Sequence, residues 1–417
     1  MIINHRLWLM CFFVFLTTLA SMAQLPSIML MTPDSSFKQR DALVLLEGQA
    51  LMGSNTLDNL FFKRVLRGGN LENSHLNAIA ERSKGQNRAG FLAGGDLEFY
   101  NFRDTLFNRP ELGLHVNIGT HYHGGINFSE DLFRTVFRGN KSFAGDTASL
   151  APLSLQYQAW QKFGIGLFNK STLSGFTLSL VEGQAYNSLI VTEANMYTSL
   201  TGDSLALSYN GEYLRSDTSR FGWANGSGVG VALDFDYNLP LKDHKGVISI
   251  SMRDLGFVFW NKQSQKIQFD SITDWTGLNV NGVFDFATDS LHFPNMEDSI
   301  YRQVESRSFF AALPATIHLR YARYFSAHDF YEAGMIMLPN RAAIPMMYAG
   351  ASHFVGEHFT FSERLYAGGY GRFGVGAEIQ WMPKGSWLFR LGTKSLGGLT
   401  MSSARSKDIY FSIGKSF

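Results

Sequence analysis

Two histidines stand one residue apart at His121-Tyr122-His123, a spacing that could serve a metal ion. On an extended strand alternate side chains point to the same face, so the two imidazoles would lie about 6–7 Å apart. Protein zinc sites use three or four ligands, and the sequence identifies no third partner for this pair. We therefore predict no metal site and interpret the pair as rim or lumen histidines of a β-structure.

A glycine-rich run also raises the question of nucleotide binding. Residues Gly369-Tyr-Gly-Arg-Phe-Gly374 match the dinucleotide fingerprint letter by letter. That fingerprint needs a helix directly after it, because the helix N-terminus holds the pyrophosphate. Here the run leads into the alternating residues Phe373–Trp381, which predict a strand. A Gly-x-Ser-x-Gly elbow before a helix is also missing from the sequence. We therefore predict no catalytic residues, no cofactor and no enzyme activity.

Charged residues placed opposite apolar ones are more informative. Between Gly228 and Tyr237, five large apolar residues alternate with a second set that includes Asp234 and Asp236. A charge facing lipid at the middle of a bilayer costs roughly 2–4 kcal/mol, so these acids would face inward or lie near a rim. The same argument gives seven candidate lumen-facing residues: Asp234, Asp236, Arg253, His318, Arg320, Glu378 and Arg390. They could line a water path, or they could pair with one another and fill a closed lumen.

The strands that would position these residues recur along most of the chain. Apolar residues alternate with small or polar ones in residues 112–119, 163–168, 175–180, 228–237, 248–253, 316–321, 373–381 and 387–392. This is the period of a strand with one apolar and one polar face. Short turns alternate with longer polar stretches, as in a transmembrane barrel. We predict an all-β fold, a transmembrane antiparallel β-barrel of about 14 strands within a range of roughly 12–16.

A few short helices are predicted near the N-terminal part of the barrel. Thr56–Leu66 has a capping threonine and an apolar stripe, and Glu72–Arg82 follows it. Ser129–Gly139 begins with a capping serine and has acids in its first turn. In Ala42–Leu51, apolar residues occupy odd and even positions alike, so the segment would not have one apolar and one polar face as a strand. It could form a first strand or a short helix. The helices could lie at the rim, enter the lumen as a plug or face the periplasm.

The N-terminus has the features of a secretory signal. A positive charge, the apolar run Leu7–Leu16 and small residues at Ser21 and Ala23 predict a signal peptide over residues 1–23. The run is shorter than the roughly 20 residues of a membrane-spanning helix. Residues 24–417 would then form one barrel domain. The chain's one cysteine would leave with the signal, so the mature protein would contain no disulfide.

Composition narrows the class of protein further. Hydrophobic residues make up 45% of the chain and charged residues 17%, below the usual quarter. The formal charge is +1, without the basic excess of a nucleic-acid-binding protein. Six tryptophans are predicted to lie mostly near strand ends, in interfacial aromatic girdles: Trp160, Trp223, Trp260, Trp275, Trp381 and Trp387.

The last ten residues, Asp408–Phe417, show the same two-faced pattern. Ile409, Phe411 and Ile413 alternate with small or polar residues, which predicts a strand. We expect it to pair with the N-terminal strand and close the barrel. The terminal Phe417 resembles the final aromatic by which outer-membrane barrels are recognised for assembly, and this resemblance implies that it acts as the assembly signal.

Several of these patterns together resemble a known family. They are Ser251–Trp260, the segment Gly124–Phe128 followed by the helix Ser129–Gly139, and Leu313-Pro314 before the strand Ile317–Tyr324. They resemble outer-membrane β-barrels that have a domain-of-unknown-function label and are common in Bacteroidota. The resemblance covers most of the mature chain and implies a signal peptide and a barrel similar to long-chain fatty-acid transporter-like barrels. It implies no established activity and no functional residues.

We therefore expect a protein of the outer membrane of a Gram-negative cell, surrounded by lipid and inserted by the barrel assembly machinery. It would pass or bind a small solute, hydrophobic solutes included. The alternative is a closed barrel that acts as scaffold or anchor for a periplasmic or surface protein partner in a secretion, motility or surface assembly. A third interpretation, a secreted soluble β-sandwich, would have to bury both the apolar faces and the strand edges. No nucleic-acid partner is expected.

Overall fold

The computed structural model of the protein describes residues 41–83, 85–220, 222, 225–243, 245–276, 304–326, 328–338, 340–383 and 386–417. Within these residues, fourteen antiparallel strands close into a barrel, as the alternation predicted. The predicted signal peptide, residues 1–23, lies outside the described residues, as does Trp223.

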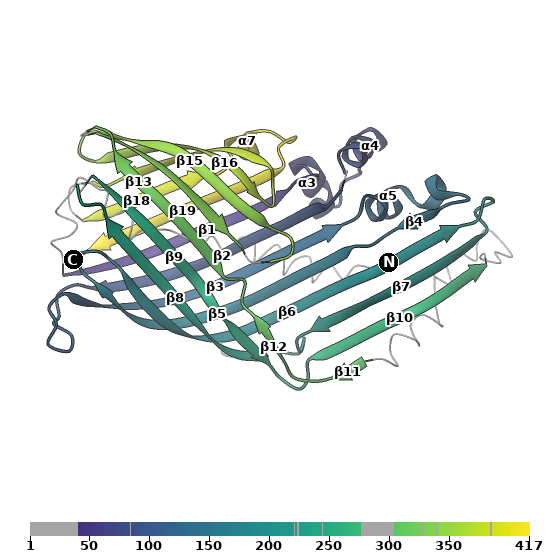
Figure 1. Cartoon of the computed structure of the whole chain (residues 1–417), viewed down its shortest axis with the longest axis horizontal. Helices are drawn as coiled ribbons and strands as arrows, with labels where there is room; N and C mark the ends of the chain where they lie inside the picture. The colour runs from purple at the N-terminus through teal and green to yellow at the C-terminus, as the bar shows by residue number, and fades with distance from the viewer. Residues whose placement is uncertain are drawn as a thin grey trace.

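The fourteen strands follow one another around the ring in chain order (Figure 1). They are β1 (Ala42–Ser54), β2 (Asn87–Asn101), β3 (Leu112–Phe128), β5 (Leu153–Asn169), β6 (Gly175–Thr198), β8 (Gly228–Pro240), β9 (Gly246–Trp260), β13 (Thr316–Tyr324), β14 (Asp329–Met337), β15 (Ile344–Val355), β16 (Phe359–Gly369), β17 (Phe373–Trp381), β18 (Trp387–Thr393) and β19 (Ser406–Ser416). The segment that could have been strand or helix, Ala42–Leu51, is therefore a strand.

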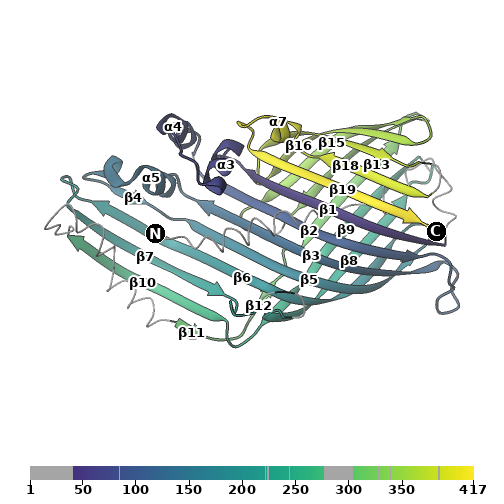
Figure 2. The same cartoon turned by 180° about the vertical axis from the view of Figure 1, so that it is seen from behind.

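The last strand closes the barrel against the first. β19 pairs with β1 from Leu43↔Ser416 to Gly53↔Ser406, and the two lie side by side in Figure 2. The backbone N–H of Phe417 also donates to the carbonyl of Ala42 at 2.9 Å. The predicted pairing of the two chain ends is therefore confirmed. Its role in assembly stays a prediction.

One wall of the barrel is longer than the others. Five further strands belong to it or adjoin it: β4 (Thr147–Ser149), β7 (Ser204–Arg215), β10 (Gln265–Thr276), β11 (Val304–Ser306) and β12 (Phe309–Ala312). β6 pairs with β8 in its first half and with β7 in its second half, and β7 pairs with β10. The sheet β6–β7–β10 thus projects beyond the ring, as Figure 1 shows.

The outer face of the barrel is apolar because the strands alternate as predicted. On β8, Val229 is 71% exposed whereas its neighbours Gly228 and Gly230 are buried. Leu180 on β6 and Phe373 on β17 are similarly exposed. An apolar exterior with a polar interior is the arrangement of a barrel that faces lipid.

Inward glycines leave room for inward aromatic rings, as expected for the lumen face. A Cβ at Gly90 would lie 2.1 Å from the ring of Tyr370, and one at Gly392 would lie 2.3 Å from the ring of Tyr410. A larger residue at either position would have to displace a buried ring.

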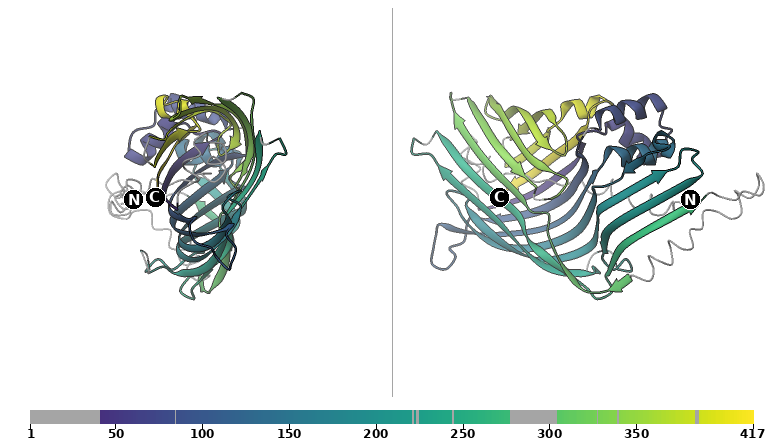
Figure 3. Two further views of the ribbon diagram at one scale, coloured as in Figure 1. Left: turned by 90° about the vertical axis from the view of Figure 1, so that its left-hand side faces the viewer. Right: turned by 45° about the vertical axis from the view of Figure 1, so that its right-hand side comes forward.

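Helices lie at one rim of the barrel, opposite the end where the described chain begins and ends (Figure 3). They are α3 (Asn59–Arg67), α4 (Asn73–Arg82), α5 (Glu130–Arg138), the 3-10 turn η2 (Asn140–Phe143) and α7 (Leu396–Thr400). The residues with described structure include no helix both long enough and apolar enough to cross a membrane.

The first predicted helix begins later than the sequence suggested. Asp58, not Thr56, caps α3, because its side chain accepts a hydrogen bond from the N–H of Phe61 at 3.0 Å. Thr56 is buried and its hydroxyl donates to Asn87 on β2 at 2.8 Å. The cap of α5 by Ser129 is as predicted.

The prediction of interfacial tryptophans is wrong for two of the six. Trp160 and Trp260 are 1% and 0% exposed and pack inside the barrel with Val258. They face inward because of their parity on β5 and β9. Trp381 and Trp387 are partly exposed near the rim that holds the chain ends, and both stack on Phe389.

Candidate functional site inside the barrel

All seven lumen-facing candidates named from the sequence have side chains inside the barrel. Asp234 and Asp236 lie on β8, Arg253 on β9, His318 and Arg320 on β13, Glu378 on β17 and Arg390 on β18. The structure brings them into two groups, one around β8 and β9 and one from β13 to β18. Whether they act on a solute stays a prediction.

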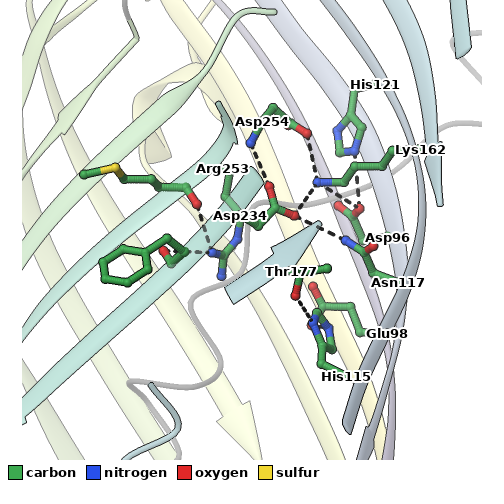
Figure 4. Close-up of polar contacts among 12 residues, drawn as sticks. Asp96, Glu98, His115, Asn117, His121, Lys162, Thr177, Asp234, Arg253 and Asp254 are labelled. Atoms are coloured by element: carbon green, nitrogen blue, oxygen red, sulfur yellow. Dashed lines mark hydrogen bonds and ion pairs between the residues drawn. The ribbon is translucent and has the colours of Figure 1, made fainter. Parts of the chain in front are cut away.

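The first group surrounds a lysine that the sequence analysis did not name. Lys162 on β5 places its Nζ 2.9 Å from Asp234 Oδ2, 2.9 Å from Asp254 Oδ1 and 4.0 Å from Asp96 Oδ1 (Figure 4). Its side chain is 2% exposed. Three carboxylates therefore lie around one ammonium group.

Asp254 enters this cluster through a β-bulge. Its φ is 57°, in the left-handed region, and the register of β8 and β9 shifts beside it. Its backbone N–H donates to Asp234 Oδ1 at 2.7 Å. The extra residue lets both Arg253 and Asp254 point inward although they are consecutive.

Further polar contacts continue along the same wall. Arg253 Nη2 lies 2.9 Å from Asp236 Oδ2. His115 Nε2 lies 3.7 Å from Glu98 Oε2, which also accepts a hydrogen bond from the hydroxyl of Tyr100 at 2.6 Å. The contact between His115 and Glu98 joins β3 to β2, and the pair Arg253–Asp236 joins β9 to β8.

The second group alternates arginines and glutamates across five strands. Arg320 Nε donates to Glu332 Oε2 at 2.7 Å, and Arg364 Nε donates to the other oxygen of Glu332. Glu378 accepts from Arg364 at 3.3 Å and from Arg390 at 2.8 Å. Such a chain of buried pairs joins neighbouring strands, and removing one member would leave another charge unpaired.

Two tyrosines and the remaining predicted residue border this second group. His318 Nε2 lies 2.7 Å from the hydroxyl of Tyr348. The hydroxyl of Tyr410 donates to Glu378 at 2.8 Å.

Sequence reasoning missed Lys162, Asp96, Asp254, Glu332 and Arg364. Lys162 and Arg364 each lie next in sequence to exposed apolar residues and therefore point to the other face of the strand. The alternation could have identified both. Asp254 could not be identified in this way, because its bulge changes the parity of β9.

The two sequence-predicted histidines of β3 have separate partners. His121 Nε2 lies 3.3 Å from Asp96, whereas His123 Nε2 lies 2.6 Å from the hydroxyl of Tyr370. In the described part of the chain, no group of three or more His, Cys, Asp or Glu side chains could hold a metal ion.

The connection between β14 and β15 folds into the barrel. Asn340 Nδ2 lies 3.2 Å from His123 Nε2, and Asn127 Nδ2 donates to the carbonyl of Arg341 at 2.6 Å. A Cβ on Gly125 would lie 2.7 Å from the Cβ of Ala342. Because β3 is not a neighbour of β14 or β15 in the ring, this connection crosses the interior.

Two adjacent cavities lie on one side of this inward connection. The outer cavity, about 720 Å³, lies at the helix-bearing rim beside Ser129 and Pro152. The inner cavity, about 280 Å³, is lined by the buried residues His123 and Tyr186 and also by Phe310, which is 68% exposed. Their linings share Ser154, Ile190 and Arg341, so the two volumes are adjacent.

Together the closed antiparallel ring, the apolar exterior and the charged interior define a β-barrel of the outer-membrane class. The chain belongs to DUF5723, a family of unknown function, whose model matches residues 31–379. No curated protein matches the sequence.

Solved structures of outer-membrane barrels are similar in fold. The toluene transporter TodX of P. putida is 12% identical over 94% of this chain and 92% of that chain, with a TM-score of 0.40. A TodX deltaS2S3 mutant, described as a monoaromatic hydrocarbon channel, is 10% identical over 96% of each chain, with a TM-score of 0.44. The translocator domain of autotransporter NalP from Neisseria meningitidis is 10% identical over 90% of this chain and 88% of that chain, with a TM-score of 0.31. The likeness concerns the barrel fold alone.

Proposed function

We propose that the protein is an outer-membrane barrel that binds and passes a small, uncharged, largely apolar solute. The observation that supports this proposal is the pair of adjacent cavities, about 720 Å³ and about 280 Å³, leading inward from the helix-bearing rim. Volumes of this size are typical of small-molecule sites. The solute would enter at the rim and reach the inner cavity past Ser154.

The lining of the cavities favours an uncharged solute. Phe128, Leu153 and Val191 supply apolar surface to the outer cavity. Its lining also includes Arg341 and two acids that already have partners: Glu130 pairs with Arg134, and Asp131 accepts a hydrogen bond from the N–H of Ser149. Gln156 and Ser188 add groups that can form hydrogen bonds in the inner one. The ion-pair groups around Lys162 and Glu378 do not line either cavity.

The helix-bearing rim would face the cell exterior. Outer-membrane barrels place short turns on the periplasmic side and longer loops outside. The rim with the chain ends has short connections, such as residues 325–328 and 356–358, whereas the other rim carries α3, α4 and α5.

Uptake into liposomes containing the purified barrel tests the proposal. Ser154→Phe places a ring where the two cavities meet and should reduce uptake of small uncharged solutes severalfold. Ala367→Phe is the matched control, because Ala367 is exposed on the outer face of β16. Wild-type uptake no greater than in empty liposomes would reject passage, and equal uptake by Ser154→Phe would reject the proposed route.

The second candidate function is a closed barrel that anchors a periplasmic or surface partner. It is favoured by the two ion-pair groups and by the inward connection at Asn340–Ala342, which reduce the free space inside the barrel. A barrel without solute uptake or conductance that co-purifies with one partner in stable stoichiometry would support this function instead.

A further inference from the structure

A third cavity lies among the arginines of the second ion-pair group. Its volume is about 90 Å³, and its lining includes Arg253, Arg320, Arg364, Arg390, Lys394 and Glu332. Five basic side chains therefore face one cavity to which a single carboxylate residue contributes. The two cavities assigned to the solute do not include these residues.

Two of these arginines have N–H groups that lack acceptors. Arg320 uses Nε on Glu332, and its Nη1 and Nη2 have no hydrogen-bond partner among the described residues. Arg390 contacts Glu378 through Nη2, while Nε and Nη1 are without a partner in the same part of the chain. The two residues are only 4% and 8% exposed.

Buried donors of this kind require an acceptor. A guanidinium N–H taken out of water and left unpaired is unfavourable, and its charge strengthens a hydrogen bond to an anionic oxygen. Glu332 and Glu378 are already shared between two arginines each. The unpaired donors of Arg320 and Arg390 are therefore available to a ligand in the cavity.

We propose that this cavity binds a small oxyanion, such as phosphate or a carboxylate, through Arg320 and Arg390. About 10–15 Å³ of comparable volume suffices for one water molecule, so the cavity has room for a group of several heavy atoms. The planar fork of arginine matches the geometry of such oxygens. The assignment goes beyond the proposed function, because it concerns a separate cavity and a charged ligand.

A second cavity lies next to the site, beneath the turn between β16 and β17. A neighbouring cavity of about 60 Å³ shares Ile336, Tyr366 and Lys394 with the anion site. Arg372, at that turn, also lines it. The lining of this neighbouring cavity also includes the acid Asp408, so its two basic side chains outnumber one acidic side chain, which favours an approaching anion.

Calorimetric titration of the folded protein with inorganic phosphate at constant ionic strength tests the inference. We expect one saturable site that acetate competes for and that chloride at the same ionic strength does not. The double variant Arg320→Lys/Arg390→Lys keeps both charges but removes the unpaired fork, and it should weaken phosphate binding at least tenfold. Arg323→Lys is the control, because Arg323 forms an exposed ion pair with Asp243 at the rim.

Three results would overturn the inference: no saturable phosphate binding to the wild type, equal competition by chloride, or undiminished binding in the double variant. The heat-dependent mobility shift on SDS-PAGE reports whether each variant is a folded barrel. If the double variant does not fold, the single variant Arg320→Lys provides the test, since Arg320 pairs with Glu332 alone.

Discussion

Lys162 Nζ lies 2.9 Å from Asp254 Oδ1, although their strands β5 and β9 are not neighbours in the ring. Lys162 also lies 2.9 Å from Asp234 on β8, so one ammonium joins three parts of the wall. A buried charge shared in this way holds strands together beyond their backbone ladder. Its removal would leave Asp234 and Asp254 without their cation.

Lys162→Met should therefore destabilise the barrel by about 3–5 kcal/mol, because it leaves buried carboxylates unpaired. Urea unfolding of the protein in lipid vesicles measures this loss. Lys266→Met is the matched control, since Lys266 pairs with Glu212 in a more exposed setting and should change stability by about 0–1 kcal/mol. Equal effects of the two substitutions would contradict a special role for Lys162.

The backbone of Asp254 predicts a second difference. With φ at 57°, Asp254→Asn should be tolerated better than Asp254→Val, by about 1–2 kcal/mol, because a β-branched residue is strained in the left-handed region. Both variants lose the charge, but only Asn keeps a polar group, so the same pair of substitutions is needed at a position with ordinary backbone. Urea unfolding of Asp234→Asn and Asp234→Val gives the comparison at a position without a positive φ. If the Asn and Val variants differ in unfolding free energy as much at Asp234 as at Asp254, the backbone conformation at the bulge is not the cause.

The bulge also marks what alternation could and could not predict. The alternation of apolar and polar residues predicted the antiparallel barrel and its apolar exterior. It could do so because few charged side chains are tolerated on a surface that faces lipid. It could not show that Asp254 faces inward, since one extra residue reverses the parity of everything after it on β9. Nor could it distinguish a surface turn from the inward connection at Asn340, whose partner His123 is remote in sequence. Trp160 was assigned to an interface from residue type, whereas its parity on β5 places it inside.

A third prediction concerns pH at the rim helices. Burial by itself raises the pKa of Asp58, but hydrogen bonds from His75, Phe61 and Arg82 outweigh it and hold that pKa below its ordinary value. A depressed folded-state pKa stabilises α3 and α4 above the unfolded value near about 4, and this contribution is lost as pH falls through the folded pKa.

Amide exchange of α3 and α4, corrected for the intrinsic rate at each pH, should show protection falling as pH decreases below about 4. In Asp58→Asn, protection should be lower at neutral pH and should depend less on pH. A wild type and a variant with the same pH profile would show that Asp58 does not control the rim.

The inward connection predicts a change in conductance. Deleting residues 340–342 removes the contacts to His123, Gly125 and Asn127, and single-channel conductance in planar bilayers should rise severalfold. Tyr370→Phe loses only a hydroxyl that contacts His123, so its rise should be smaller. Unchanged conductance in a folded deletion variant would show that this connection does not obstruct the barrel.

The final prediction concerns assembly at Phe417. Its ring is 58% exposed and lies 5.2 Å from the ammonium of Lys415, while its backbone pairs with Ala42. Phe417→Asp would leave the backbone pairing possible but remove the outward aromatic. This change should lower insertion, measured as the heat-modifiable fraction in outer membranes, whereas Phe417→Tyr should retain it. Because the backbone bonds are common to both variants, normal insertion of Phe417→Asp would show that closure depends on the β1–β19 pairing and not on this ring.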